Sequence, residues 1–403
     1  MPIIYAVIVL FLLYTSLIFY YHISWNSIPL FVPDPDYPSI KISVIIAARN
    51  EEENISALLK SVTRQSYHGD LTEIIVVDDH STDRTAEIVR HFPSVKLVQL
   101  TDDPGNSYKK KAIEAGIAAS TGDLIVTTDA DCIAPTVWLE TIAKCKAKTN
   151  AVLIVAPVSF IPINKTTPSG VVEPANVVII KPEDVELMEF GSNANNTILS
   201  GFQQLDFLVL QGITGASVYK GIHSMCNGAN FAYDKNVFYE VKGFEGIDDI
   251  ASGDDMLLMH KVGKKYPSDI TYLYSQNAIV YTQPMKTWSA FLNQRIRWAS
   301  KATYYKDWRI FSVLLLVYLF NLSFLLLFVA GFFNFDYWIW LAGLWAAKTL
   351  IEIPFVNSVA RFFGKQNLIV WFFFFQPLHI IYTIISGLFG QFGKYEWKGR
   401  RVK

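Results

Sequence analysis

Short apolar runs alternate with amphipathic segments over the first part of the chain, and this pattern predicts its fold. Continuous apolar runs without a polar face are typical of strands that are buried on both faces of a sheet. The predicted strands are 42–47, 74–77, 95–100, 124–128 and 151–160, and the predicted helices include 85–90 and 110–119. Strands that alternate with helices form mostly parallel sheets with right-handed crossovers. We therefore expect an α/β, Rossmann-like domain with helices on both faces of the sheet.

Beyond the fifth predicted strand the periodic pattern is lost. Residues 161–200 gather Pro, Asn and Gly, and we interpret them as a surface insertion. Apolar spacing returns at 203–211 and 256–262, which we predict to be helical, whereas 227–233 resembles a strand or a loop. We expect the α/β domain as a whole to cover residues 40–286.

Four much longer apolar runs predict membrane segments. A spanning helix needs about 20 mostly apolar residues, and the candidate runs are 2–21, 310–333, 337–356 and 368–391. With 51% hydrophobic and 18% charged residues, the chain is too apolar for an ordinary soluble protein. The first run lacks a basic start and a small-residue cleavage site, so we predict an anchor over 1–24 and not a cleaved signal peptide.

Polar residues interrupt the last two of these runs. Lys348 and Glu352 lie four residues apart, so they could form a structural ion pair or face a polar cavity. Gln376 and Pro377 interrupt the final run and are followed closely by His379. We expect this final run to kink or to re-enter the membrane.

Flanking charges predict an orientation in the membrane. Residues 287–308 carry alternating aromatic and basic side chains, which suits a helix at the membrane interface. The tail 392–403 is basic, which predicts a cytoplasmic end. A cytoplasmic domain followed by three full spans would place this tail outside. We therefore expect 309–391 to contain one re-entrant or interfacial hairpin, and we assign it to the segment that contains Pro377.

Acidic residues follow two of the predicted strands. Asp78 and Asp79 come after the second strand, and Asp129 and Asp131 come after the fourth. Parallel strands end at one edge of a sheet, where open α/β sheets bind ligands, so we expect both pairs on one rim. Their oxygens could hold a divalent cation and a phosphate. Alternatively, these residues cap the helices that follow, and a D-x-D triplet on its own is weak evidence.

Charge and cysteine content exclude several other functions. The net charge of −1 leaves no broad basic surface, so we expect no nucleic-acid partner. Cys132, Cys145 and Cys226 show no metal-ligand spacing, and we interpret them as packing residues in a reducing compartment. The histidines are scattered along the chain and do not predict a metal site.

Five ordered motifs give the chain a resemblance to family 2 of the glycosyltransferases. They read SVIIAARNEE, IVVDDHSTD, TTDADC, SGDD and NQRIRW, and they extend from about residue 42 to 298. The resemblance implies a GT-A fold and an inverting, membrane-attached enzyme. It also implies that Asp79, or alternatively Asp78, contacts the nucleotide base, and that Lys109 or Lys110 lies near the nucleotide.

The same resemblance assigns the chemistry of the remaining motifs. Asp129 and Asp131 would hold the sugar diphosphate and its Mg²⁺ or Mn²⁺, which stabilises the charge of the leaving group. Asp255 occupies the general-base position. Asp254 stands where the family commonly has Glu, so the choice between these two acids stays open.

The NQRIRW motif combines three residues on one helical face. Gln294, Arg297 and Trp298 fall at i, i+3 and i+4. The resemblance implies that Gln294 and Arg297 bind the diphosphate, and that Trp298 stacks on a sugar or lines the acceptor entrance. An amphipathic helix among lipid headgroups is the alternative. The segment 226–230 corresponds to the acceptor side, where a packed turn is an equal alternative to direct contact.

These observations predict an integral membrane protein of the plasma or inner membrane with a cytoplasmic catalytic domain. We expect a metal-dependent, hexosyltransferase-type enzyme that moves a sugar from a nucleotide-sugar donor, such as a UDP-sugar, to a lipid or glycan acceptor. A processive polysaccharide synthase is one alternative. A membrane protein that binds nucleotide sugars without turnover is another.

Overall fold

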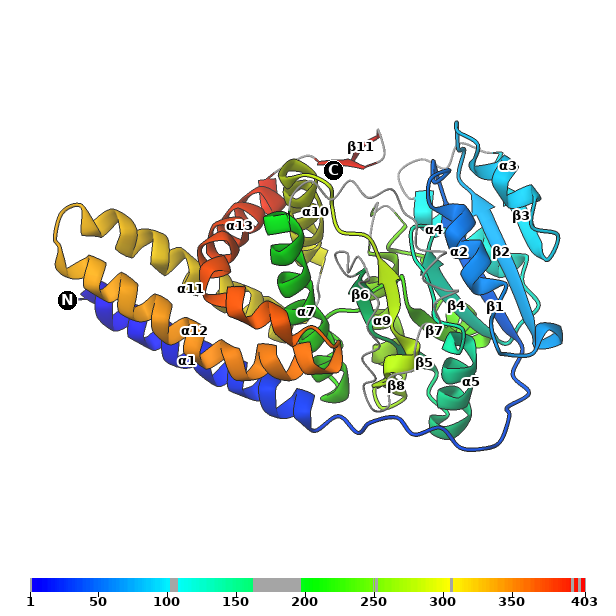
Figure 1. Cartoon of the computed structure of the whole chain (residues 1–403), viewed down its shortest axis with the longest axis horizontal. Coiled ribbons are helices and arrows are strands. Elements are labelled where there is room, and N and C mark those ends of the chain that lie inside the picture. Colours follow the sequence, from blue (N-terminus) through cyan, green and yellow to red (C-terminus); the bar gives the residue numbers. More distant parts are fainter. Residues whose placement is uncertain are drawn as a thin grey trace, which may run out of the picture. The chain divides into compact units, whose positions relative to one another are not determined.

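The chain divides into two compact units, each of which is described by itself. The computed structural model describes residues 2–101, 108–161, 197–248, 250, 253–304, 307–392, 395–397 and 400–402. An α/β unit comprises Pro29–Asn195 and His223–Pro284, and a helical unit comprises Met1–Ile28, Asn196–Ile222 and Met285–Lys403. Figure 1 shows the sheet of the first unit and the long helices of the second.

A seven-stranded sheet forms the centre of the α/β unit, in the order β3-β2-β1-β4-β7-β5-β8. Its strands are β1 Ile42–Ala48, β2 Thr72–Asp78, β3 Val95–Gln99, β4 Leu124–Asp129, β5 Leu153–Val155, β7 Phe231–Asp234 and β8 Ile270–Tyr272. Only β7 runs against its neighbours β4 and β5 among these strands. The predicted α/β fold with a mostly parallel sheet is therefore confirmed.

Helices cover the two faces of this sheet. They are α2 Ile55–Val62, α3 Thr85–Arg90, α4 Tyr108–Ala118, α5 Trp138–Thr149, α8 Lys235–Glu240 and α9 Asp254–Lys265, with short 3-10 turns η1 Gly69–Leu71 and η3 Gln276–Ala278. The sequence pattern did not predict α5, whose apolar positions alternate with Lys and Thr. Its Trp138 is nevertheless fully buried and donates a hydrogen bond from Nε1 to Asn230 Oδ1 over 2.9 Å.

The predicted strand 151–160 is two strands. β5 ends at Val155, and β6 Val158–Phe160 pairs in a second sheet with β9 Val280–Thr282. Pro157 separates the two, because proline has no N–H to donate to a ladder. Most of the predicted insertion 161–200 lies outside the described residues, and its last four residues begin a helix of the other unit.

The helical unit contains four candidate membrane spans among its described residues, judged by length and composition: Ile3–Asn26, Trp308–Gly331, Asp336–Phe362 and Gln366–Gln391. Its elements are α1 Pro2–Asn26, α7 Thr197–Tyr219, α10 Trp288–Ala299, η4 Ser300–Tyr304, α11 Trp308–Gly331, α12 Asp336–Phe362, η5 Gln366–Trp371, α13 Phe372–Phe392, β10 Tyr395–Trp397 and β11 Arg400–Val402. The four predicted apolar runs are thus all helical.

α7 belongs to the helical unit, although the predicted catalytic domain over 40–286 includes it. Its buried side chains occupy several sides of the helix and include Leu205, Leu208 and Val218. Leu205 packs with Val356 of α12, and a Cβ on Gly212 would meet Val359 at 2.4 Å. An apolar helix of this kind is buried most completely among other apolar helices.

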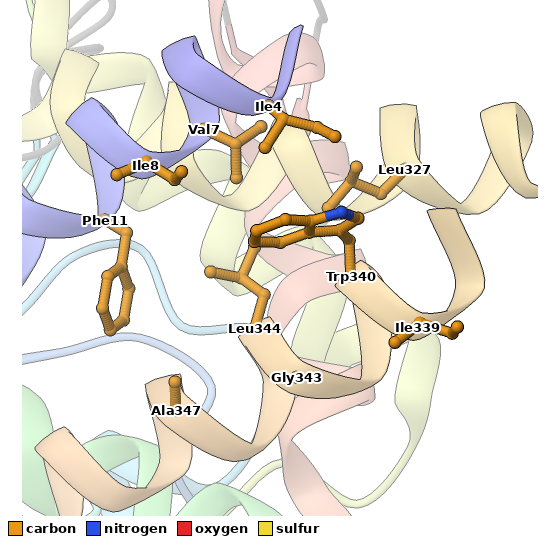
Figure 2. Close-up of a pocket in the computed structure, with 10 residues that line it drawn as sticks. All are labelled: Ile4, Val7, Ile8, Phe11, Leu327, Ile339, Trp340, Gly343, Leu344 and Ala347. Atoms are coloured by element: carbon orange, nitrogen blue, oxygen red, sulfur yellow. The ribbon is translucent and has the colours of Figure 1, made fainter. Parts of the chain in front are cut away.

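α1, α11 and α12 pack side by side in alternating directions. The ring of Tyr14 in α1 stacks on Phe320 of α11 at 4.4 Å between centroids, and Trp25 meets Phe362 of α12 edge-on at 5.6 Å. Near the start of α1, Ile4 shares an apolar groove of about 370 Å³ with Trp340 (Figure 2). α1 therefore runs parallel to α12 and antiparallel to α11.

The segment after α12 begins and finishes at the same end of this bundle. The N–H of Lys365 bonds to Ala360 O at 2.8 Å, so η5 starts beside the end of α12. A Cβ on Gly390, near the end of α13, would lie 2.8 Å from Ala299 Cβ at the end of α10, the α-helix that precedes α11 in the chain. The re-entrant course itself stays a prediction. α13 continues as one helix through Pro377, so this proline does not end the helix.

The polar residues of α12 form a closed network. Lys348 Nζ lies 2.8 Å and 3.0 Å from the two carboxylate oxygens of Glu352, and 2.6 Å from Gln376 Oε1. Tyr14 and Gln376 donate hydrogen bonds to the same carboxylate. Tyr14, Lys348, Glu352 and Gln376 are all buried, so the structure supports the ion-pair interpretation of Lys348 and Glu352 over the polar-cavity one.

Candidate active site at the carboxyl ends of the strands

Strand register brings the two predicted acidic pairs to one rim. β1 lies between β2 and β4, with Ala48 opposite Asp78 on one side and Ala47 opposite Asp129 on the other. The two acids thus follow parallel strands that end within one residue of each other. Asp79 follows Asp78 directly and Asp131 follows Asp129 after Ala130, as the sequence predicted.

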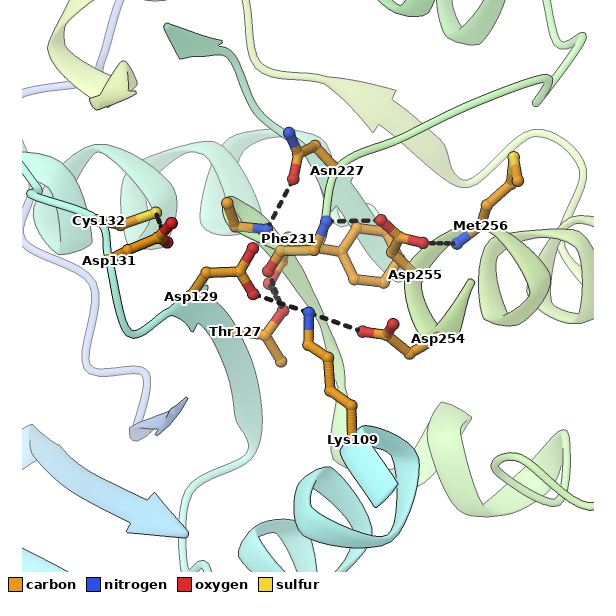
Figure 3. Close-up of polar contacts among 12 residues, drawn as sticks. Lys109, Thr127, Asp129, Asp131, Cys132, Asn227, Phe231, Asp254, Asp255 and Met256 are labelled. Carbon is orange, nitrogen blue, oxygen red and sulfur yellow. Dashed lines mark hydrogen bonds and ion pairs between the residues drawn. The ribbon is translucent and has the colours of Figure 1, made fainter. Parts of the chain in front are cut away.

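Lys109 lies among the acids of this rim. It reaches in from α4, and its Nζ is 2.7 Å from Asp129 Oδ1 and 3.3 Å from Asp254 Oδ2. Figure 3 shows the ammonium group between these two carboxylates, which come from β4 and from the start of α9. Lys109 therefore connects the acid of the TTDADC motif to the first acid of the SGDD motif.

Charge and burial act in opposite directions on Lys109. Burial by itself would lower the pKa of its ammonium group, but the carboxylates of Asp129 and Asp254 outweigh this effect and raise the pKa. Lys109 is therefore a permanent cation at neutral pH. It offsets part of the negative charge of the cluster.

The neighbouring Lys110 has a different role. Its side chain is buried, and its Nζ donates to the carbonyl oxygens of Ile247 and Ile250. These bonds hold the loop before α9 in place. Of the two lysines that the resemblance left open, the structure thus places Lys109 at the acidic cluster.

Asp255 is fixed by backbone N–H groups. Its Oδ2 accepts from Gly228 N at 2.8 Å, and its Oδ1 accepts from Met256 N at 2.7 Å (Figure 3). Both Asp254 and Asp255 lie in the first turn of α9, where the helix dipole stabilises negative charge. Asp254 faces the ammonium of Lys109, whereas two backbone N–H groups orient the carboxylate of Asp255 (Figure 3).

Backbone atoms of the segment 226–230 pack against the acidic cluster. Thr127 of β4 donates from Oγ1 to Gly228 O at 2.9 Å. A Cβ on Gly228 would lie 3.3 Å from Asp254 Oδ2 and 3.5 Å from Lys109 Nζ. Asn230 is fully buried and donates to Pro157 O and Ala278 O. Asn230 is therefore a packed turn residue and Gly228 lies beside the acids, whereas contact of this segment with the acceptor stays a prediction.

Asp78 and Asp79 have different partners in the structure. Asp78 accepts from Ser81 N at 3.2 Å and from Gln99 Nε2 at 3.2 Å, as a residue that stabilises the turn before α3. Asp79 lies 2.9 Å from His80 Nδ1, and Arg49 of the first motif approaches it to 3.8 Å. The cap alternative thus fits Asp78, while Asp79 lies with two basic side chains at the strand end.

Asp131 occupies the turn after β4. The thiol of Cys132 approaches its Oδ1 at 3.8 Å. Burial, together with the charges of Asp131 and Asp129, raises the pKa of this thiol well above its usual range. Cys132 is thus a neutral packing residue, and the negative charge at the turn belongs to the two aspartates.

The third group of predicted residues lies in the helical unit. Gln294, Arg297 and Trp298 are all on α10, and each of them is partly exposed. That these three residues share a binding site with the acidic cluster stays a prediction. Between them, Arg295 is buried, and its Nη2 forms a salt bridge with Asp206 of α7. Arg295 therefore does not serve as a headgroup contact on the exposed side of an interface helix.

Sequence reasoning missed several residues that shape these sites. The hydrophobic periodicity of the sequence does not single out Gly228 or Arg295. Gly228 lies in the segment 226–230, and Arg295 lies in the NQRIRW motif. Asp206 lies on a helix that the sequence assigned to the other domain. A charged residue within an otherwise apolar helix is the signal that could have indicated Asp206.

A divalent cation fits the chemistry of the acidic cluster. The carboxylates of Asp129 and Asp254 contact the ammonium of Lys109, and Asp131 and Asp255 follow closely along the chain, so carboxylates outnumber the cation at this rim. Among the described residues no group of three or more His, Cys, Asp or Glu side chains is placed to form a cage that could hold a metal ion. Mg²⁺ and similar ions use one or two carboxylates and complete their shell with substrate phosphates, so such a cage is not required.

Comparison with known proteins identifies the class. The solved structure of the mannosyltransferase PcManGT from Pyrobaculum calidifontis in complex with GDP-Man and Mn²⁺ is similar over 96% of both chains, with a TM-score of 0.53 at 17% identity. At this identity the likeness shows the fold. The protein thus has the fold of a GT-A glycosyltransferase that carries helices apolar enough to cross a membrane.

Sequence profiles name the family within this class. The profile described as Glycosyl transferase family 2 matches residues 43–198, and that of Glycosyl transferase family group 2 matches 186–383. The chain belongs to glycosyltransferase family 2, and the resemblance drawn from the five motifs is confirmed.

Two curated relatives illustrate the range of the match. The probable glycosyltransferase YdaM of Bacillus subtilis is 28% identical over 264 residues, which are 64% of this chain and 54% of YdaM. The beta-monoglucosyldiacylglycerol synthase of Synechocystis sp. is 31% identical over 102 residues, which are 24% of this chain and 21% of that synthase. The matched region thus spans about half of YdaM and a smaller part of the synthase.

Proposed function

We propose that the protein is an inverting glycosyltransferase that moves a sugar from a nucleotide-sugar donor, such as a UDP-sugar, to a lipid acceptor at the cytoplasmic face of a membrane. The observation that carries this proposal is the convergence of Asp79, Asp129, Asp131 and Asp255 on one strand rim. It is supported by the presence of membrane-type helices in the same chain. The Synechocystis relative is named a beta-monoglucosyldiacylglycerol synthase, and this name supports a lipid acceptor.

The rim divides the donor into a base end and a phosphate end. Asp79, oriented by His80 and Arg49, accepts hydrogen bonds from the nucleotide base. Asp129 and Asp131 would hold Mg²⁺ or Mn²⁺, and the bound ion would offset negative charge on the diphosphate. Lys109 supplies a second, fixed positive charge near the phosphates.

Asp255 is the base that we assign. The acceptor hydroxyl attacks the anomeric carbon, its proton passes to Asp255, and the diphosphate leaves with the electron pair of the broken C–O bond. The two N–H bonds to Asp255 hold its carboxylate in one orientation, which a base needs. Asp254 is a positioning residue in this scheme, because Lys109 occupies its Oδ2.

Gln294, Arg297 and Trp298 complete the proposal from the helical unit. An amide and a guanidinium offer hydrogen-bond donors to the diphosphate, and the indole offers an apolar face to a sugar. The helical unit would also hold the hydrocarbon part of the acceptor in the bilayer. The catalytic centre would then react with the head group of a lipid whose hydrocarbon part stays in the membrane.

Purified full-length protein in detergent tests this function. A panel of UDP- and GDP-sugars with Mn²⁺ and membrane-lipid acceptors should give release of nucleoside diphosphate and one labelled lipid product. Asp255→Asn should lower turnover by about a thousandfold, whereas Asp70→Asn, in the exposed turn η1, should leave it unchanged. The proposal is wrong if no donor is turned over, or if both variants match the wild type.

A further inference from the structure

Arg295 is held by a complete set of partners inside the helical unit. Its Nε and Nη2 donate to Asp206 Oδ2 at 3.0 Å and 2.5 Å. Tyr382 of α13 donates a hydrogen bond to the other oxygen of the same carboxylate. The side chains of Arg295 and Asp206 are 3% and 2% exposed, so this pair is closed to solvent. The guanidinium therefore has one fixed position, which three helices determine.

The same guanidinium contacts Gln294 and Trp298 of the NQRIRW motif. Its Nη1 donates to Gln294 Oε1 at 2.8 Å. Its carbon lies 4.3 Å from the ring centre of Trp298 and 4.6 Å from that of Phe291. Arg295 thus holds the side chains of Gln294 and Trp298 by a hydrogen bond and by a cation–π contact.

The contact with Gln294 also decides how that amide is oriented. A guanidinium carries only donors, so the amide must turn its oxygen toward Arg295. The NH₂ group of Gln294 then points away from Arg295 with two N–H donors. Those donors suit an anionic or hydroxyl-bearing ligand and not a cation.

We propose that Arg295, anchored by Asp206 and Tyr382, is a positioning residue that orients Gln294 as a two-proton donor and holds Trp298 for the glycosyl-transfer reaction. This inference rests on the proposed function. It says which residues of the helical unit hold the side chains of the NQRIRW motif in place. Arg295 touches no substrate in this scheme, and its effect passes through its two neighbours on α10.

A paired substitution separates positioning from folding. Exchanging a buried ion pair for apolar residues of similar size often leaves stability unchanged or higher. Asp206→Leu with Arg295→Met should therefore keep a melting temperature within about 4 °C of the wild type in detergent. The kcat/KM for donor turnover should nevertheless fall about tenfold, because Gln294 loses its fixed orientation.

Adding Gln294→Ala to the paired variant tests whether Arg295 affects kcat/KM through Gln294. The Gln294 variant alone should also lose about tenfold, and the triple variant should lose clearly less than the product of the two losses. A support that acts through Gln294 cannot act once its side chain is removed. Wild-type kcat/KM in the paired variant, or fully multiplicative losses, would overturn the proposal.

One further variant decides the matter if the paired variant does not fold. Arg295→Lys keeps a cation for Asp206 but lacks the planar fork that reaches Asp206 and Gln294 together. A loss of about tenfold in kcat/KM supports the proposal, and wild-type kcat/KM overturns it. A wild-type protein without any turnover would instead count against the proposed function, so the two failures are distinguishable.

Discussion

The ammonium nitrogen of Lys109 lies 2.7 Å from a carboxylate oxygen of Asp129, the first acid of the TTDADC motif. The two side chains come from α4 and from the end of β4, and 20 residues separate them in sequence. A metal ion at Asp129 and the lysine would repel each other, since both are cations. The effect of Lys109 on the affinity of the site for a metal ion should therefore be measurable.

Removing the charge of Lys109 should tighten metal binding. We expect Lys109→Met to bind Mn²⁺ about tenfold more tightly without donor, because a nearby positive charge no longer opposes the ion. Electron paramagnetic resonance of free Mn²⁺ measures this affinity. Lys109→Arg keeps the charge and serves as the control. Equal or weaker binding by Lys109→Met would show that the lysine does not compete with the metal.

A methyl group at position 228 should disturb the acids without unfolding the domain. Its Cβ would lie 3.3 Å from Asp254 Oδ2 and 3.5 Å from Asp255 Cβ, so α9 must give way slightly. We expect Gly228→Ala to lower kcat about tenfold, because a small displacement of a base is costly in rate. Gly69→Ala is the matched control, since nothing lies within 4 Å of its Cβ. Equal activity of both variants would place Gly228 outside the reaction.

The three cysteines should differ in reactivity. Burial raises the pKa of the Cys145 thiol to about 12, and Cys132 is also buried, whereas Cys226 is partly exposed. Only the thiolate reacts, so maleimide at about pH 8 should label Cys226 and spare the other two in the folded protein. Mass spectrometry of peptides measures the labelling. Cys226→Ala should remove it, and labelling of Cys145 at a similar rate would contradict the buried position.

Glu73 should contribute stability that acid removes. Burial by itself would raise the pKa of its carboxyl, but hydrogen bonds from Ser43, Thr121 and Gly122 lower it overall. The folded state then binds fewer protons than the unfolded state. The stabilisation is present above the unfolded-state pKa of about 4.3 and is lost as pH falls toward the lower folded-state value.

Thermal unfolding of full-length protein in detergent tests this contribution. At about pH 7 we expect Glu73→Gln to melt several degrees below the wild type, with a difference that shrinks toward pH 3. Glu87→Gln, on the exposed side of α3, should melt like the wild type at each pH. A difference that is constant with pH would show that Glu73 acts through shape and not through its charge.

Much of the α/β unit follows from local sequence. β1, β2, β3 and β4 occupy the predicted apolar runs to within two residues at each end, because continuous β-branched stretches suit a strand that is covered on both faces. Parallel strands end together, so the positions of Asp78 and Asp129 on one rim also followed. In contrast, β7 enters the sheet antiparallel between β4 and β5, and only long-range pairing determines that insertion.

The sequence alone determined the chemistry of this protein: which acids follow which strands, which helix carries the NQRIRW motif, and which runs are apolar enough for a membrane. The tertiary structure decided which side chains and helices contact one another. It selected Lys109 over Lys110, gave α7 to the helical unit and buried Arg295 against Asp206. Local preference depends on neighbours along the chain, whereas an ion pair between residues 89 positions apart depends on how whole helices pack.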